Sequence, residues 1–257
     1  MALLEVNGLV KLFGGLAAVS SFDMKIEKGE LVGLIGPNGA GKTTVFNLLT
    51  GVYVPTRGSI DFNGESLIGM KPSMVNQKGL ARTFQNIRLF KDLSVLDNVR
   101  IAYHSHVKYT ILDAVIRSPR FFKEEAEVEE KAIQFLKIFR LDGKKDELAK
   151  NLPYGEQRRL EIARALAAQP DFLLLDEPAA GMNPQETQEL MELIKWIRDE
   201  FKLTILLIEH DMSLVMGVCE RIYVLDYGMI IAEGNPEEIR KNPRVIQAYL
   251  GEEAADA

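Results

Sequence analysis

The stretch Gly36-Pro-Asn-Gly-Ala-Gly-Lys-Thr43 decides which fold this sequence is expected to adopt. Gly36 and Gly41 enclose four residues, and Lys42 and Thr43 follow directly, which completes the spacing of a phosphate-binding loop. Glycines let the backbone curl, so that consecutive N–H groups point inward at phosphate oxygens. Lys42 can bridge the terminal phosphates, and the Thr43 hydroxyl can bind Mg²⁺. The spacing therefore predicts a site for a nucleoside triphosphate.

The residues on either side of the loop have the context that such a site needs. Residues 31–35 are almost entirely apolar and predict a buried strand, and residues 43–50 predict a helix that ends at Gly51. This helix would present its positive N-terminal end to the phosphates. The alternative is a glycine-rich turn that binds nothing. A dinucleotide fingerprint fits less well, because the glycines follow a G-x-x-G-x-G order, the reverse of the one required.

A second acidic motif follows the apolar strand predicted at 172–175, where Asp176 and Glu177 precede Pro178. Ligands of open α/β sheets bind at the carboxyl ends of the strands. We assign Asp176 to the metal ion and Glu177 to the general base that polarises the water attacking the γ-phosphate. The alternative is an acidic turn at the end of a strand, with no ligand.

The rest of the chain predicts an α/β fold with a phosphate-loop NTPase core, a mostly parallel sheet, an antiparallel β subdomain on the N-terminal side and a helical subdomain. The strands come from short apolar or alternating runs. An amphipathic helix is expected over 121–139, with apolar residues at 128, 132, 135, 136 and 139. We expect one domain over 1–257, with the core at 1–90 and 165–235, the helical subdomain at 91–164, and C-terminal helices with a frayed tail at 236–257.

Composition narrows the function classes. The chain has 257 residues and a net charge of −6, which argues against a nucleic-acid partner. Cys219 is the single cysteine, so no internal disulfide forms, and with three histidines it gives no zinc-ligand pattern. The N-terminus lacks the pattern of a signal peptide, and apolar runs stay far below the roughly 20 residues that span a bilayer. A role at a membrane must therefore come through a partner.

The order of motifs resembles the ATP-binding-cassette (ABC) ATPases over nearly the whole chain. The phosphate loop is followed by Gln85, by Leu152-Pro-Tyr-Gly-Glu156, by Asp176-Glu177 and by His210. The resemblance is closest to the ATP-binding subunits of branched-chain amino-acid importers. It rests there on the stretches Phe13-Gly-Gly-Leu-Ala-Ala-Val, Ala81-Arg-Thr-Phe-Gln-Asn-Ile-Arg-Leu-Phe, Leu152-Pro-Tyr-Gly and Asp176-Glu-Pro-Ala-Ala-Gly-Met-Asn-Pro.

The resemblance implies roles for individual residues in binding and hydrolysing ATP with Mg²⁺. The implied nucleotide-binding residues are Phe13, Gly36, Pro37, Asn38, Gly39, Ala40, Gly41, Lys42, Thr43, Thr44, Leu152, Tyr154, Gly155 and Glu156. The implied catalytic residues are Glu177, His210, Gln85 and Lys42, and the implied metal ligands are Thr43, Gln85 and Asp176. Phe13 would stack on adenine, and His210 would contact the γ-phosphate. Taken alone, Phe13 would fit a core position, Gln85 a solvated loop and His210 a structural strand end.

The same resemblance implies partners. Residues 152–156 would start a helix facing ATP held by a second ATPase subunit, identical or homologous. Two transmembrane permease subunits would receive the motion, with the segment 84–93 lining the cleft for a permease helix, although Phe90 and Leu93 fit a core equally well. A substrate-binding protein would act indirectly. The implied location is the cytoplasmic face of the inner membrane.

Several positions depart from the commonest pattern of the family. Pro153 stands where serine is usual, Tyr154 replaces a glycine, Glu156 replaces a glutamine, and Asn183 replaces an aspartate. We treat the arginines at 158, 159 and 164 as a solvated or salt-bridged helix face. Alternative functions are a urea-type importer, a lipopolysaccharide-export ATPase, and a soluble ABC protein acting on ribosomes or DNA. The last fits poorly, because the chain has one phosphate loop and no basic tract.

Overall fold

The computed structural model describes residues 2–253, and its contacts divide the chain into two compact units. Unit 1 contains the residues up to Arg82 and those from Asp171 onward, and unit 2 is Thr83–Pro170. The expected helical subdomain had limits at 91 and 164. The observed unit also includes residues 83–90 and 165–170, so it contains the whole of the helix that follows Pro153.

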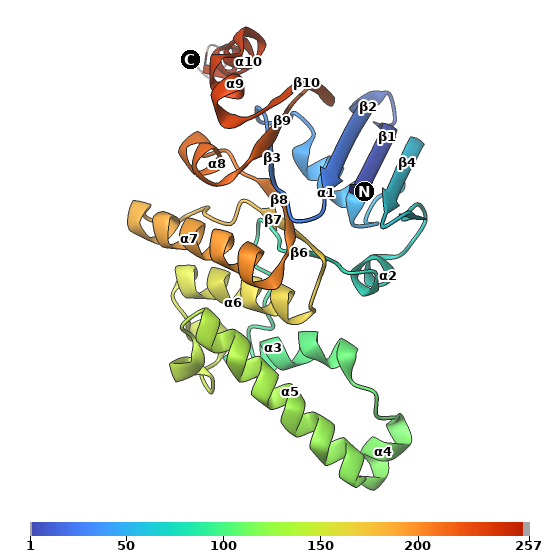
Figure 1. Cartoon of the computed structure of the whole chain (residues 1–257), viewed down its shortest axis with the longest axis vertical. Helices are drawn as coiled ribbons and strands as arrows, with labels where there is room; N and C mark the ends of the chain where they lie inside the picture. Colours follow the sequence, from blue (N-terminus) through green and yellow to red (C-terminus); the bar gives the residue numbers. More distant parts are fainter. Residues whose placement is uncertain (1, 254–257) are drawn as a thin grey trace. The chain divides into compact units, whose positions relative to one another are not determined.

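Unit 1 is an α/β unit with two sheets (Figure 1). Its strands are β1 (Ala2–Phe13), β2 (Leu16–Glu27), β3 (Leu31–Ile35), β4 (Arg57–Phe62), β5 (Glu65–Ser66), β6 (Leu80–Arg82), β7 (Phe172–Asp176), β8 (Thr204–Ile208), β9 (Arg221–Asp226) and β10 (Met229–Gly234). Its helices are α1 (Lys42–Leu49), α2 (Pro72–Gln77), α7 (Pro184–Phe201), α8 (Met212–Val218), α9 (Pro236–Lys241) and α10 (Pro243–Glu253).

The larger sheet has the order β10-β9-β3-β8-β7-β6, in which β10 pairs antiparallel with β9 and the other pairs are parallel. Every residue of β3, β7 and β8 is buried, as continuous apolar runs predict for a parallel sheet covered on both faces. Gly33 of β3 is held close to Val215 and Cys219 of α8, where a Cβ atom would lie 3.0 and 3.1 Å from their side chains. The expected phosphate-loop NTPase core is confirmed.

The smaller sheet is antiparallel, with the order β2-β1-β4-β5. Its strands alternate between buried and exposed side chains, and the buried ones join the same apolar core as α1 and the inner strands. This is the antiparallel β subdomain that the alternating sequence predicts. The backbone of Ser20 also donates to the carbonyl of Gly228 at 2.7 Å, which joins β2 to the turn between β9 and β10.

Unit 2 is built from helices, as the middle of the sequence predicts. They are α3 (Val95–Tyr103), α4 (Ile111–Ile116), α5 (Pro119–Ile138) and α6 (Tyr154–Ala167), with short 3-10 helices η1 (His104–His106), η2 (Asp142–Lys144) and η3 (Ala149–Asn151). Helices α3, α5 and α6 pack on one another. The five apolar positions expected to line α5 are all buried, and Phe139 caps the helix.

A few local expectations were wrong. Strands β5, β6 and β10 were missed, because the first two have only two and three residues and β10 has a largely half-exposed pattern. The expected frayed tail, residues 252–257, falls mostly on residues 254–257, which lie outside the described part, and α10 continues through Glu253. In the part of the chain from residue 2 to residue 253, no helix is both long enough and apolar enough to cross a membrane.

Candidate functional site

The glycine-rich loop joins β3 to α1, and its conformation requires glycine at two positions. Gly36 has a φ of 153° and Gly41, the N-cap of α1, has a φ of 107°. A Cβ atom would lie 2.0 Å from the Leu225 carbonyl oxygen at Gly36 and 2.5 Å from the Ala18 oxygen at Gly41. Any side chain there would collide with backbone. Because Gly41 is the N-cap of α1, the free N–H groups of the first helical turn directly follow the loop.

Lys42 folds back across this loop. Its Nζ donates to the carbonyl oxygens of Gly36 at 2.6 Å and Pro37 at 2.8 Å, and the residue is buried. These bonds hold the ammonium over the loop, where phosphate oxygens would meet both the positive charge and the helix N-terminus. Thr43, in the same first turn, is exposed. The geometry fits a triphosphate.

An aromatic side chain lies on the hairpin that borders the loop. Phe13 ends β1 and is 42% exposed, and its ring meets that of Tyr53 edge-on at 5.3 Å. Strand β2 returns from this hairpin, and the carbonyl oxygen of Ala18 faces Gly41 of the loop. A half-exposed aromatic face beside a phosphate loop suits stacking on a base.

The acidic pair lies on a strand that is in register with the loop. Leu34 of β3 pairs with Ile208 of β8, and Ile208 pairs with Asp176 of β7, so the ends of all three strands are level. Glu177 follows Asp176 with a φ of 47°, and its N–H donates to the Ile208 carbonyl at 2.9 Å. The left-handed backbone at Glu177 is costly for a non-glycine residue and often marks a functional site.

The carboxylate of Asp176 has a cationic partner that the sequence analysis missed. Arg82, on the neighbouring edge strand β6, places Nη2 2.7 Å from Oδ2 of Asp176, and both side chains are more than nine-tenths buried. The same guanidinium donates to Oδ1 of Asn47 in α1 at 2.7 Å and lies 5.4 Å from the centre of the Phe46 ring. Arg82 thus connects the acidic motif to the helix of the phosphate loop.

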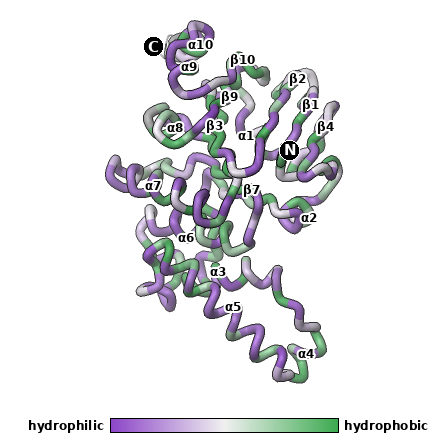
Figure 2. The backbone as a smooth tube through the Cα atoms, in the orientation of Figure 1, coloured by the Kyte–Doolittle hydropathy of each residue, from purple (hydrophilic) through white to green (hydrophobic). Residues whose placement is uncertain are grey.

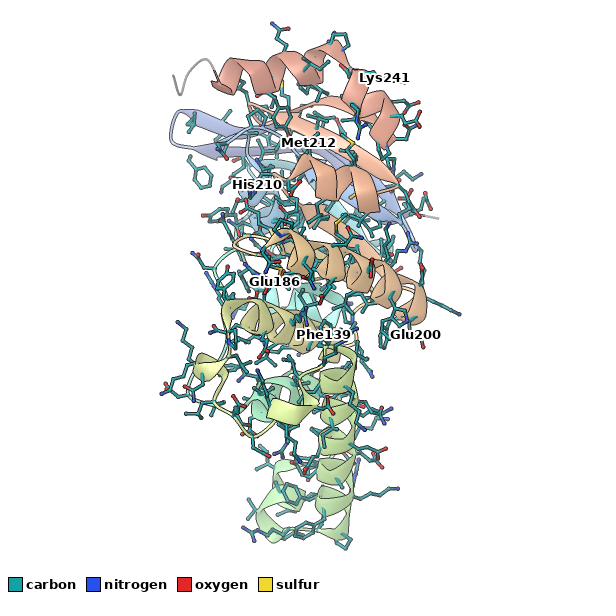
Figure 3. All side chains as sticks on the ribbon, turned by 90° about the vertical axis from the view of Figure 1, so that its left-hand side faces the viewer. Phe139, Glu186, Glu200, His210, Met212 and Lys241 are labelled. Carbon is teal, nitrogen blue, oxygen red and sulfur yellow. The ribbon has the colours of Figure 1, made fainter. Side chains whose placement is uncertain are left out.

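His210 stands beside Glu177. It follows β8 and precedes Met212, the first residue of α8 (Figure 3), and its imidazole is largely exposed. Nδ1 lies 3.8 Å from Oε2 of Glu177 and 3.8 Å from Oε2 of Glu209. The structure therefore brings the predicted base and the predicted histidine together.

Glu209 is a second residue that the sequence analysis missed. Its carboxylate is buried and accepts the N–H of Ala179 at 2.9 Å and that of His210 at 3.2 Å. Burial raises the pKa of this carboxyl, against the opposing effect of those N–H groups. Glu209 directly follows β8, so its bond to Ala179 connects the end of β8 to the segment after Glu177.

The predicted metal ligands within unit 1 are Thr43 and Asp176. A threonine hydroxyl and a carboxylate are the hard oxygen donors that Mg²⁺ prefers. The side chain of Thr43 is exposed at the first turn of α1, and Asp176 ends its strand level with β3. The residues fit the ion. Gln85, the third predicted ligand, belongs to unit 2 and is exposed.

Unit 2 carries the other predicted residues at the start of α6. Pro153 is the N-cap, Tyr154 is the first helical residue, and Leu152 is buried just before them. The carboxylate of Glu156 is bound by Lys144, whose Nζ lies 2.8 and 2.7 Å from its two oxygens. Gly155 is half-buried in the first turn, where helix N–H groups are available to an anion.

The arginines of α6 were expected to form a solvated or salt-bridged helix face, and a salt bridge does form at Arg158, although in the interior of unit 2. Arg158 is fully buried and pairs with Glu161 at 2.8 Å. It also donates to the carbonyl oxygens of Phe84 at 2.6 Å and Gln85 at 2.8 Å, so it fixes the backbone that carries Gln85. Arg164 is partly buried, and the loss of solvent lowers its pKa. The glutamate at i+3 from Arg158 suits an ion pair on a helix, but nothing local in the sequence indicates that this pair is buried.

Comparison with known proteins gives a consistent result. The sequence profile described as "ABC transporter" matches residues 19–180. The chain is 50% identical to the high-affinity branched-chain amino acid transport ATP-binding protein LivG of Salmonella typhimurium, over 97% of this chain and 98% of LivG. The chain belongs to the ABC transporter family.

Further comparisons refine this membership. The profile described as "Branched-chain amino acid ATP-binding cassette transporter" matches residues 229–255 of this ABC cassette. BraF of Pseudomonas aeruginosa, also a high-affinity branched-chain amino acid transport ATP-binding protein, is 48% identical over 97% of this chain and 98% of its own length. The crystal structure of the ADP conformation of MJ1267, an ATP-binding cassette of an ABC transporter, matches with a TM-score of 0.84 and 30% identity over 98% of this chain and 99% of MJ1267.

Membership confirms the predicted activity: the chain is an ABC ATPase that binds and hydrolyses ATP. It also accounts for the arrangement in unit 1, where the loop, the acidic motif and His210 come from three level strands. The residues that sequence reasoning missed, Arg82, Glu209 and Arg158, hold other residues in place. Each binds a partner far away in sequence or a backbone atom, so short motifs gave no signal for them.

Proposed function

We propose that this ABC ATPase is the nucleotide-hydrolysing subunit of an importer for branched-chain amino acids. The observation that supports hydrolysis best is the register of β3, β8 and β7, which sets Lys42, Glu177 and His210 at one edge of one sheet. The cargo assignment is supported by sequence identities of 50% to LivG and 48% to BraF over nearly the full length of each. The residues at 153, 154, 156 and 183 that depart from the commonest family pattern are then features of the branched-chain amino-acid importers.

In the proposed mechanism, the loop amides and Lys42 hold the β- and γ-phosphates, and Phe13 stacks on the adenine. Mg²⁺, when bound, neutralises charge that develops on the phosphates. Glu177 accepts a proton from the attacking water, and His210, 3.8 Å away, contacts the γ-phosphate and orients that water. Both groups act on the same water, which explains why they share one edge.

Gln85 and the start of α6 complete the proposed site. Gln85 would be a further ligand of Mg²⁺ and would reach the attacking water, and it would link hydrolysis to the permeases. The first-turn amides around Tyr154 and Gly155 face the γ-phosphate of ATP on a second ATPase subunit, identical or homologous. ATP binding closes this pair, and hydrolysis opens it again.

We propose that the subunit works at the cytoplasmic face of the inner membrane, attached to two transmembrane permeases that receive cargo from a substrate-binding protein. The segment 84–93 is the proposed contact with a permease helix. Phe90 and Leu93 are 47% and 36% exposed, which favours a contact surface over a core position. Nucleic acid has no part in this function.

The first experiment tests the general base. Glu177→Gln keeps the shape of the side chain and removes its basicity. We expect ATP binding close to that of wild type and steady-state turnover lower by about 100-fold or more. Glu200→Gln, the same chemical change on the exposed end of α7 (Figure 3), should leave both unchanged. Turnover near wild type in Glu177→Gln would remove Glu177 from this role.

The second experiment tests the cargo. The subunit would be co-purified with its permeases, reconstituted with the binding protein, and assayed for ATPase activity with single amino acids. We expect stimulation by leucine, isoleucine and valine. Stimulation by urea instead, or assembly with a lipopolysaccharide exporter, would overturn the cargo assignment and leave the ATPase activity intact.

A further inference from the structure

The outer face of α4 and the first turn of α5 expose a concentrated group of large apolar side chains. Ile111, Leu112, Val115, Ile116 and Phe122 are 85%, 67%, 74%, 64% and 57% exposed. Figure 2 shows α4 in green next to the mostly purple helix α5. Single exposed apolar residues are common, but five of them on one short helix and the next helical turn indicate a surface that meets a partner. We call these five residues the α4 face.

The surrounding hydrogen bonds hold the α4 face in place. Thr110 and Asp113 form a capping box, in which each side chain accepts from the other residue's backbone. Asp113 also accepts from Oγ of Ser118 at 2.9 Å, which joins the start of α4 to the start of α5. Arg117, with a φ of 51°, ends α4 and reverses the chain. The apolar side chains are therefore exposed by a defined fold, and not by fraying.

The segment that carries this face is cationic, although acids of α5 follow it directly from Glu124. Residues 107–123 carry four cations, Lys108, Arg117, Arg120 and Lys123, and one acid, Asp113. The net charge of this segment is therefore +3 (four minus one), in a chain whose net charge is −6. All four cations are exposed. A cationic rim around an apolar face complements a surface that is anionic outside and apolar beneath.

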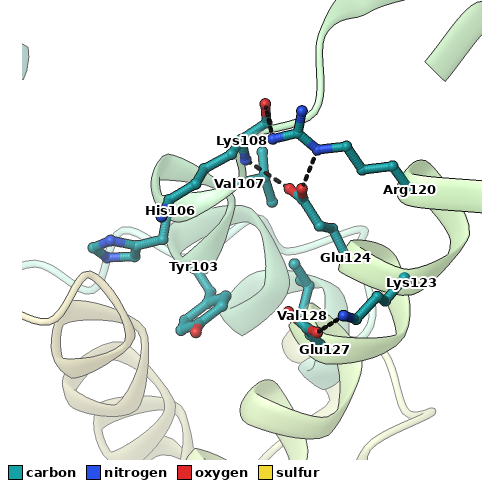
Figure 4. A pocket seen from close by; sticks show the side chains of 9 residues that line it. All are labelled: Tyr103, His106, Val107, Lys108, Arg120, Lys123, Glu124, Glu127 and Val128. Atoms are coloured by element: carbon teal, nitrogen blue, oxygen red, sulfur yellow. Dashed lines mark hydrogen bonds and ion pairs between the residues drawn. The ribbon is translucent and has the colours of Figure 1, made fainter. Parts of the chain in front are cut away.

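A cavity of about 420 Å³ between η1 and α5 lies next to this rim (Figure 4). Lys108, Arg120 and Lys123 line it together with Glu124 and Glu127. Glu124 is already engaged, because it accepts from Nε of Arg120 at 2.8 Å and from the backbone of Lys108. These bonds lower the pKa of Glu124, so its carboxylate stays ionised, and its charge is balanced by that of Arg120. Nζ of Lys123 lies 4.0 Å from Oε1 of Glu127, so the two acids offset Arg120 and Lys123, and the excess positive charge of the rim lies on Lys108 and Arg117.

We propose that the α4 face and its cationic rim dock on the surface of a bilayer containing anionic lipids. The aliphatic and aromatic side chains would enter the boundary between headgroups and acyl chains, and Lys108, Arg117 and Lys123 would meet lipid phosphates. Apolar insertion and a basic rim are the two signals that together give stable attachment, whereas either one alone is marginal.

A lipid surface fits these residues better than a protein does. A specific protein interface uses polar groups to fix register, with aromatic anchors among them. The α4 face has four aliphatic side chains and one phenylalanine, so its polar contacts are confined to the cations of the rim. The segment 84–93, with its arginine and phenylalanine side chains, is a separate surface and carries the proposed permease contact. The inference goes beyond the proposed function and does not depend on it.

The test measures binding of the purified full-length chain to vesicles by flotation. Vesicles of phosphatidylglycerol mixed with phosphatidylcholine should bind it, and vesicles of phosphatidylcholine alone should bind it far more weakly. Ile111→Ser/Val115→Ser/Ile116→Ser should weaken binding by about 100-fold or more. Lys108→Gln/Arg117→Gln/Lys123→Gln should weaken it by about 100-fold. Both variants should keep wild-type ATPase turnover.

The matched control is Lys28→Gln/Lys195→Gln/Lys202→Gln, which makes the same change in charge at exposed positions of unit 1. It should retain binding, because the proposal assigns the effect to the rim and not to net charge. A second readout reports insertion. In a Trp196→Phe background, Leu112→Trp should shift its emission to the blue on anionic vesicles and be quenched by lipids brominated in the acyl chain.

Two results would overturn the proposal. One is equal binding to both kinds of vesicle, with no loss of binding in the Ile111/Val115/Ile116 variant or in the Lys108/Arg117/Lys123 variant. The other is unchanged vesicle binding together with loss of permease assembly in the Ile111/Val115/Ile116 variant, which would make the α4 face a protein-docking surface. Neither result would affect the assignment of ATPase activity.

Discussion

At the scale of single residues, the pair of Arg82 and Asp176 couples the proposed metal ligand to the rest of unit 1. Their distance of 2.7 Å and almost complete burial make this a charge pair whose separation is costly. Bound Mg²⁺ and Arg82 are both cations that the Asp176 carboxylate can balance. The nucleotide-free protein therefore relies on Arg82 for a charge balance to which the metal contributes once it is bound.

Arg82→Met should accordingly lower the free energy of unfolding of the nucleotide-free protein by about 3–5 kcal/mol, measured by urea denaturation. Mg²⁺ with ATP should raise the melting temperature of this variant more than that of wild type, because the ion replaces part of the missing charge. Adding Asp176→Asn should recover much of the loss, since no buried carboxylate then lacks that cation. Equal stability of the single and double variants would contradict the coupling.

Glu209 gives a prediction about pH. Burial raises its pKa above the ordinary value of 4.5, so the folded protein keeps this proton to a higher pH than the unfolded chain does. The contribution of Glu209 to the free energy of unfolding therefore falls as pH rises from 4.5 through the pKa of the folded state, and it is constant above that. Glu209→Gln cannot ionise and lacks this penalty. The difference in unfolding free energy, variant minus wild type, should rise with pH across that window, and it should stay flat for Glu200→Gln.

At the scale of elements, helix α6 begins without the serine that is usual in the family. Pro153 is its N-cap and has no N–H or hydroxyl to offer, so the amides of the first turn must supply most of the contact with a γ-phosphate. A serine there would add a donor to a charged acceptor, and it would also suit an N-cap position.

Pro153→Ser should tighten ATP-induced dimerisation of the isolated subunit by about tenfold. Sedimentation velocity would measure this in a Glu177→Gln background, where ATP persists. Pro243→Ser, the same change at the start of α10, serves as the control and should have no effect. A dimer that is unchanged or weaker in Pro153→Ser would contradict the hypothesis that a donor at position 153 strengthens the contact of α6 with the γ-phosphate.

Elements also show how far sequence reasoning reaches. The phosphate loop, α5 and the buried strands were predictable because a local spacing or period specifies each of them. Strand β6 has only three residues, too few for any period, yet it carries Arg82 next to β7. Arg82 and Asp176 are 94 positions apart, and Glu209 and Ala179 are 30 apart. Such pairings follow from the order of strands in the sheet, which one sequence does not reveal.

At the scale of the whole molecule, the proposed site is complete only when two chains meet. Lys42 lies in unit 1 and Gly155 in unit 2, and the proposed head-to-tail pair would place Lys42 of one copy and Gly155 of the other on the same ATP. Two defects in different chains should then complement each other, whereas the same two defects in one chain should not.

Lys42→Ala removes the charge on the phosphates, and Gly155→Asp places a carboxylate against them. Asp is favourable in the first turn of a helix, so the second variant should fold. Each variant alone should show almost no turnover. An equal mixture should regain up to about a quarter of wild-type ATPase activity, since half of the pairs are mixed and each has one intact site out of two. The Lys42→Ala/Gly155→Asp double variant mixed with either single variant is the control, because such a mixture contains no intact site. A mixture of the single variants that stays as inactive as its components would show that ATP does not join Lys42 and Gly155 of two identical chains.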